Sequence, residues 1–354
     1  MSEDIPHFNF MATGIGSVPF LDIEDTCREI LGHCPDIPFW PQFPKRSFLE
    51  DMSAQYCEGL PLLTVDENQR SLTLKPSNRT ASELTTFYEH FLAGDVDYFT
   101  ISRDHAPGLY ALLDLIDQHD EHGSPFVKGQ TVGPITFAAG ILDPDGKPLL
   151  HNAELLEAMV NGLAIKALRQ VQQLGKTGKK TILFMDEPYL SGFGSAFSSI
   201  QRHEVIQILR KIIDYLRENS DTLIGIHCCG NTDWSMIIET GIDIINFDAF
   251  EFLDHFLLYR DEVTRFIRKG GSIAWGIVPT AGYTGETSEE GLFSKIREGF
   301  DRIHQWGLDP DVLAQRSILT PACGMGTMNP EAAKKGLALL ATLSRRCKNK
   351  LLPS

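Results

Sequence analysis

The chain has 354 residues, a net charge of −15, 42% hydrophobic and 22% charged residues, which is the composition of an ordinary globular protein. The acidic balance excludes a nucleic-acid partner, because a basic face must meet the phosphates and the dense basic stretch is confined to residues 344–350. No run of about 18 apolar residues predicts a membrane span, and residues 1–10 lack the basic and apolar regions of a signal peptide.

Strand-like and helical patterns alternate along the chain. The first apolar run, at 10–15, predicts a strand, and a helix is predicted from residue 23. A proline-rich stretch at 33–79 then interrupts the order, and Asn329-Pro330 opens the last helix with proline at its first position. Further strands are predicted at 97–101, 126–132, 181–185, 222–226, 243–247, 272–276 and 317–320, and further helices at 80–92, 107–116, 153–174 and around 205–216.

This persistent alternation predicts an α/β fold with a parallel sheet, namely a single (β/α)8 TIM barrel. Neither a Ser/Gly-rich linker nor a break in composition divides the chain, so we expect one domain over residues 1–354 and no second domain. The proline-rich stretch 33–79 is interpreted as an N-terminal insertion that passes over the barrel mouth.

Polar residues follow several of the predicted strands at the point where each strand ends. Active sites of (β/α)8 barrels lie at these carboxyl ends, so the side chains are expected to converge on one face. Each of them alone could be ordinary loop chemistry, but together they form a candidate site. They are Gly16-Ser17, Gly133-Pro134-Ile135-Thr136, Asp186-Glu187-Pro188, His227-Cys228-Cys229, Asp248 and Cys323-Gly324.

His227, Cys229 and Cys323 are the residues with the clearest chemistry. Alternate residues of a strand point to the same face, so His227 and Cys229 project together while Cys228 points away. With Cys323 they would give zinc three protein ligands and an open fourth position. A thiol in that position would lose its proton and become a nucleophile at neutral pH.

An inert interpretation of the same cysteines stays open, because cysteine is often buried as a small apolar side chain. The chain has seven cysteines, an odd number with irregular spacing. Such a set favours reduced thiols over a disulfide framework, so we expect a cytoplasmic protein.

The motifs together resemble one enzyme family. The chain is similar to the catalytic barrel of cobalamin-independent methionine synthase, within the uroporphyrinogen decarboxylase-like superfamily. The matching segments occur in the family's order and span about residues 13–340. They are Ile15-Gly-Ser-Val-Pro19, Gly133-Pro-Ile-Thr136, Met185-Asp-Glu-Pro188, His227-x-Cys229, Asp243-Ile-Ile-Asn-Phe-Asp248 and Pro321-Ala-Cys-Gly324.

The resemblance implies roles for individual residues. It makes His227, Cys229 and Cys323 ligands of a zinc ion to which homocysteine binds through its sulfur. It makes Asp186 the carboxylate that holds the amino group of homocysteine, although a residue that only caps the next loop is the alternative. The substrate contacts that it implies are Ile15, Gly16, Ser17, Asp186 and Glu187; for Ser17 the alternative is a plain turn cap.

The chain departs from the family's pattern at three points. The fourth zinc ligand of the family is Glu, whereas the matching strand ends in Asp248, which is also a candidate catalytic residue; Glu251 is an alternative ligand. The family's late-strand histidine, which assists proton transfer, is missing from the segment 275–280. The extra N-terminal barrel that contributes to folate binding in the full-length enzyme is also missing.

These features predict a zinc-dependent methyltransferase acting on a small, homocysteine-like thiol. The methyl donor is expected to be a methylcobamide or a corrinoid protein, because its methyl group needs no acid to leave. This donor is expected to dock on residues 33–79. Methyl-tetrahydrofolate is the alternative donor. A metal-free enzyme resembling uroporphyrinogen decarboxylase is the alternative of another class, and a non-catalytic corrinoid-handling partner is a third.

Overall fold

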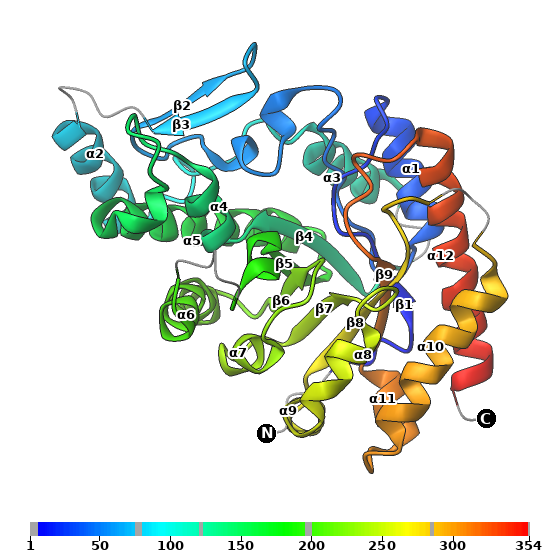
Figure 1. The fold of residues 1–354 in the computed structure, drawn as a ribbon. Helices are drawn as coiled ribbons and strands as arrows, with labels where there is room; N and C mark the ends of the chain where they lie inside the picture. Colours follow the sequence, from blue (N-terminus) through cyan, green and yellow to red (C-terminus); the bar gives the residue numbers. More distant parts are fainter. Residues whose placement is uncertain (1–5, 75–79, 120–122, 195–199, 284–286, 353–354) are drawn as a thin grey trace.

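The computed structural model describes residues 6–74, 80–119, 123–194, 200–283 and 287–352. Its main element is a sheet of seven parallel strands in the order β1-β9-β8-β7-β6-β5-β4, with helices packed on its outer side (Figure 1). The parallel α/β architecture predicted from the alternating pattern is therefore confirmed. The strands are β1 (Met11–Ala12), β4 (Phe126–Val132), β5 (Lys180–Asp186), β6 (Leu223–Cys228), β7 (Ile244–Asp248), β8 (Ser272–Val278) and β9 (Ser317–Pro321).

The helices follow the strands in the expected alternation. Their first residues are often capped by Asp, Asn or Ser side chains, as at Asp22, Asn152 and Ser288. They are α1 (Ile23–His33), α2 (Thr80–Leu92), α3 (Pro107–His119), α4 (Pro134–Gly140), α5 (Ala153–Gly175), α6 (Arg202–Asn219), α7 (Trp234–Glu239), α8 (Leu253–Phe256), α9 (Arg260–Arg268), α10 (Glu289–His304), α11 (Pro310–Gln315) and α12 (Pro330–Leu351).

The position between the edge strands β1 and β4 is taken by residues 36–42. Phe39 makes an isolated parallel bridge with Lys128 of β4, and Gln42 makes one with Ser17, which follows β1. Pro38 and Pro41 lack the N–H that a longer ladder needs, so the pairing stays short. The prediction that all of 33–79 is an insertion is therefore wrong for 36–42, which joins the wall of the sheet.

The strand predicted at 97–101 is also wrong, because these residues form turns and irregular structure. The side-chain Oδ1 of Asp95 accepts a hydrogen bond from Tyr98 N, and the backbone carbonyl of Asp97 accepts one from Thr100 N, which closes the turn. Phe99 and Ile101 are buried, which explains the strand-like apolar pattern. Both belong to the larger core, where Phe99 packs against Phe87 of α2, and neither belongs to a strand.

The remainder of the predicted insertion forms short elements beyond the sheet. Two 3-10 turns, η1 (Phe48–Glu50) and η2 (Ala54–Tyr56), are followed by an antiparallel hairpin of β2 (Leu63–Asp66) and β3 (Ser71–Leu74). Figure 1 shows this hairpin apart from the parallel strands, near α2 and α4.

Apolar side chains fill the inner side of the sheet at the amino ends of the strands. They come from alternate positions and form a cluster separate from the larger core between sheet and helices. Two residues further along, the same inner face carries Asp186 after Phe184 and Asn246 after Ile244. The inner face therefore changes from mostly apolar at the amino ends to polar at the carboxyl ends. The inner cluster consists of Phe8, Ile37, Phe126, Ile182, Phe184, Ile244, Ala274 and Ile318.

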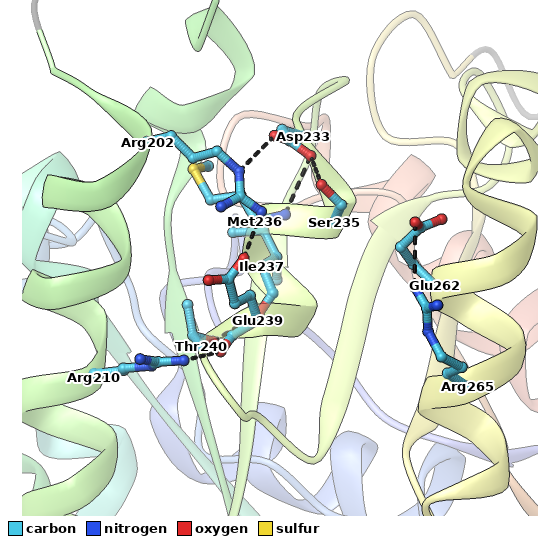
Figure 2. Close-up of polar contacts among 10 residues, drawn as sticks. All are labelled: Arg202, Arg210, Asp233, Ser235, Met236, Ile237, Glu239, Thr240, Glu262 and Arg265. Atoms are coloured by element: carbon cyan, nitrogen blue, oxygen red, sulfur yellow. Dashed lines mark hydrogen bonds and ion pairs between the residues drawn. The ribbon is translucent and has the colours of Figure 1, made fainter.

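A groove of about 1300 Å3 opens at the opposite, amino-terminal ends of the strands, beside α7 and α9. Most of its charged side chains form ion pairs: Lys180 with Asp221, and Arg217 with Asp243. Figure 2 shows that Arg202 contacts Glu239 and also Asp233, and that Arg265 contacts Glu262. No helix in the described part of the chain is long and apolar enough to cross a membrane.

Candidate metal centre

Three of the residues predicted to bind zinc lie together at the carboxyl ends of the strands. His227 is the penultimate residue of β6, Cys229 follows that strand, and Cys323 follows β9. One ligand atom from each lies within 4.8 Å of the other two. His227 is buried and the two cysteines are half-buried. Cys228, between the two β6 ligands, is buried in the core between sheet and helices, as strand alternation requires.

The imidazole of His227 is held in one orientation by Asn246. The His227 Nδ1 atom lies 2.5 Å from Asn246 Oδ1. Asn246 is itself fixed, because its Nδ2 donates to Ala274 O at 2.9 Å and to Thr320 Oγ1 at 2.8 Å. An amide oxygen only accepts, so Nδ1 carries the proton and Nε2 carries a lone pair.

The Nε2 atom of His227 is buried and has no hydrogen-bond partner in the described structure. A buried nitrogen lone pair without a partner is costly unless a ligand uses it. Its neighbours are two thiols, and an imidazole nitrogen with two thiolates is a donor set that zinc prefers. The residues present therefore fit a zinc ion with three protein ligands and one further position.

The two thiols and His227 change one another's pKa. The pKa of Cys229 is lowered to about 4, first by the neighbouring Cys323 thiol and then by the neighbouring His227. The neighbouring Cys229 and burial raise the pKa of Cys323. Burial raises the pKa of Cys228 to about 12. A thiolate is thus stabilised within the group of three, whereas Cys228 stays a neutral thiol.

The predicted fourth ligand is not part of this group. Asp248 ends β7, and its Oδ1 accepts a hydrogen bond from Glu251 N at 2.8 Å. Burial raises its pKa to about 6, and the charge of Cys229 adds to that rise. Asp248 is therefore near the thiols but outside the 4.8 Å cluster, and the Glu251 side chain is exposed. Coordination by either carboxylate stays a prediction.

Asp186 lies next to His227 at the end of the neighbouring strand β5, in direct register with it. Its side chain is buried, and its Oδ1 atom has no hydrogen-bond partner within the described residues. Burial raises its pKa to about 6, while the charges of His227 and Lys128 oppose that rise. A buried carboxylate oxygen without a donor is suited to receive a cationic group of a ligand.

The predicted substrate contacts at 15–17 pack against the loop that carries Cys323. Ser17 O accepts a hydrogen bond from Met325 N at 2.9 Å, and Ser17 Oγ accepts one from Gly326 N at 3.3 Å. A Cβ atom at Gly324 would lie 2.3 Å from Ser17 Oγ, so glycine is needed for this close approach. The Ile15–Gly16–Ser17 turn and the metal group are thereby linked.

The side chain of Glu187, which follows β5, contacts the N-terminus of α4. Its buried carboxylate accepts hydrogen bonds from Ile135 N at 3.0 Å, Thr136 N at 2.8 Å and Thr136 Oγ1 at 2.6 Å. These contacts complement the helix N-terminus, where backbone N–H groups lack partners. They give Glu187 a structural function, and its contact with substrate stays a prediction.

The sequence interpretation missed Asn246 and Lys128. Asn246 precedes Asp248 by two positions, so strand alternation would have placed it on the inner face beside His227. Lys128 stands in the middle of strand β4, in which every residue is buried, and its own side chain is fully buried. A lysine within a buried strand is rare, and this was the available signal.

We expect Asn246→Leu to weaken zinc binding by about 10- to 100-fold, because the hydrogen bond that orients a metal-binding histidine would be lost. The Kd for zinc, measured by competition with a chelator, checks this. Asn246→Asp keeps an oxygen acceptor for Nδ1 and should remain closer to the unsubstituted protein. An unchanged Kd in Asn246→Leu would show that Asn246 does not orient the ligand.

Comparison with known proteins shows which solved structures have a similar fold. No family model and no curated protein sequence matches this chain. Among solved structures, a B12-independent methionine synthase from Shewanella sp. W3-18-1, in complex with selenomethionine, matches 97% of this chain and 98% of its own. The TM-score is 0.57 and the identity 16%. The fold expected from the resemblance to methionine synthase is therefore confirmed.

More distant matches have lower scores. A 3-keto-D-glucoside 4-epimerase from E. coli matches 67% of this chain and 85% of its own, with 13% identity and a TM-score of 0.36. A GH113 β-mannanase from Alicyclobacillus acidocaldarius matches 68% and 78%, with 12% identity and a TM-score of 0.36.

Proposed function

We propose that the protein is a zinc-dependent methyltransferase that transfers a methyl group to the sulfur of a small, homocysteine-like thiol. The observation that carries this proposal is the group of His227, Cys229 and Cys323, with the unpartnered Nε2 of His227 among them. When bound there, zinc would supply Lewis-acid stabilisation of the acceptor as its thiolate.

The chain's own residues would hold and orient the acceptor. Asp186 offers an unpartnered carboxylate oxygen beside His227, suited to the ammonium group of an amino acid. The turn Ile15–Ser17 would receive the polar end of the same molecule. The methionine synthase with the matching fold is described in complex with selenomethionine, which supports an amino-acid thiol as acceptor here.

The donor is proposed to be a methylcobamide or a corrinoid protein that carries one. A methyl group on a folate nitrogen leaves poorly unless that nitrogen is protonated. The segment 275–280, which ends β8 and enters the next loop, contains no histidine that could supply the proton. A methyl group on cobalt needs no such acid. The elements at 43–74 beyond the sheet are the proposed docking surface.

The donor test uses the purified zinc-loaded protein with methylcobalamin or with methyl-tetrahydrofolate, each in the presence of homocysteine and, separately, of coenzyme M. We expect S-methylation of homocysteine, measured by mass spectrometry, with methylcobalamin. Turnover with the folate donor and none with the corrinoid would overturn the donor assignment. A protein that binds no zinc would instead favour the metal-free, decarboxylase-like alternative.

A further inference from the structure

A fully buried lysine lies beneath the candidate site. Lys128 is in the middle of β4, and its side chain has no exposed surface. Burial lowers its pKa to about 7. Moving an ammonium group out of water costs several kcal/mol unless hydrogen bonds and an opposite charge compensate. The partners of this ammonium group therefore indicate what it does.

The hydrogen bonds of Lys128 connect it to the predicted acceptor site. Its Nζ donates to Ile15 O at 2.7 Å and to Gln130 Oε1 at 3.3 Å. The Nζ atom also lies 4.5 Å from the centre of the Phe184 ring. Ile15 begins the Ile15–Ser17 turn, which packs against the loop of Cys323, so Lys128 ties this turn to the inner face of the sheet.

The backbone of Lys128 adds a third connection. Its N–H donates to Pro38 O at 2.8 Å, and its carbonyl accepts from Trp40 N at 3.4 Å. Three segments, the turn after β1, residues 36–42 and β4, therefore meet at this one residue. Lys128 therefore connects β4 to residues 36–42, which pair with the neighbouring segments of the sheet only through isolated bridges.

The charge of Lys128 also acts on the candidate acceptor site. Asp186, on the neighbouring strand β5, is the carboxylate with which the buried ammonium group interacts electrostatically. The Asp186 Oδ1 atom has no hydrogen-bond partner among the described residues, so the interaction leaves that oxygen available. Attraction between a buried cation and a nearby buried anion lowers the free-energy cost of keeping both charges inside the protein.

We propose that Lys128 is a positioning residue for the acceptor. Its ammonium group holds the Ile15–Ser17 turn through the hydrogen bond to Ile15 O, and its positive charge compensates the negative charge of Asp186. This inference rests on the proposed function, because it assigns Lys128 to the site that would bind the amino-acid thiol. It adds a residue that has no expected contact with the acceptor or the metal.

The test compares Lys128→Met with Lys166→Met in the zinc-loaded protein. Lys166 is a matched control: it is equally buried and donates to a backbone carbonyl, Phe99 O at 3.3 Å, but it lies on the outer helix α5. Zinc content, melting temperature, kcat and the KM for homocysteine are measured for both, with methylcobalamin as donor. Lys128→Gln is measured in parallel, so that the result does not depend on the folding of one variant.

We expect the Lys128 variants to raise the KM for homocysteine by about 10- to 100-fold, because a displaced substrate contact has effects of that order, while zinc content and kcat at saturation change little. Lys166→Met should lower the melting temperature without changing KM. A KM that is unchanged in both Lys128 variants, or equally raised in Lys166→Met, would overturn the positioning function. Absence of turnover in the unsubstituted protein would instead contradict the proposed function.

Discussion

Cys229→Ala and Cys323→Ala are expected to remove bound zinc and methyl transfer, whereas Cys228→Ala is expected to retain both. Structural zinc sites with four protein ligands bind with about 10–16 kcal/mol, so one ligand of such a site accounts for about 100- to 1000-fold in affinity if the four contribute equally, and we expect a loss of at least this size here. Cys229 and Cys323 belong to the 4.8 Å group, whereas Cys228 lies on the other face of β6. The metal content of each purified variant, measured by mass spectrometry, checks this.

Cys228→Ala is the matched control, because it also removes a cysteine thiol and its position is adjacent to Cys229. It should reduce stability modestly, since a buried side chain loses its packing contacts. Equal loss of zinc in all three variants would contradict the strand-face argument. Such a result would mean that zinc content follows the general stability of the fold and not the three proposed ligands.

The second large effect is expected for Asp186→Asn, which should weaken the binding of homocysteine by about 10- to 100-fold while zinc stays bound. A charge-assisted hydrogen bond to an ammonium group contributes about 1.5–3 kcal/mol, and the amide side chain cannot replace its charge. Affinity for homocysteine, measured by calorimetry on the zinc-loaded protein, checks this.

Asp243→Asn is the control for this substitution. Asp243 is half-buried and accepts a hydrogen bond from Ile224 N at 2.9 Å, but it precedes β7 at the opposite end of the sheet. Its substitution should leave the affinity for homocysteine unchanged. Equal affinities in Asp186→Asn and the unsubstituted protein would indicate a thiol acceptor that has no amino group.

Local patterns predicted much of this molecule. The period of two in a strand was enough to place His227 and Cys229 on one face and Cys228 on the other. The ends of parallel strands lie at one edge of a sheet, so Cys323 could be assigned to the same site although it is 94 positions beyond Cys229 in the sequence. These inferences need only the strand pattern and the strand ends.

Contacts between distant segments could not be predicted in the same way. The segment 36–42 joins the wall through only isolated bridges, and its two prolines give it no strand pattern. The residues at 97–101 resemble a strand because Phe99 and Ile101, at alternate positions, are buried in the larger core. The hydrogen bond from Lys128 to Ile15 connects residues 113 positions apart and has no signature in either local pattern.

The most direct test of the zinc–thiolate account is X-ray absorption at the zinc edge of the purified protein, with and without homocysteine. We expect bound zinc with two sulfur ligands at about 2.3 Å and one imidazole nitrogen at about 2.0 Å, from Cys229, Cys323 and His227. Addition of homocysteine should increase the number of sulfur ligands to three. A protein without zinc, or a sulfur shell that homocysteine leaves unchanged, would contradict the account.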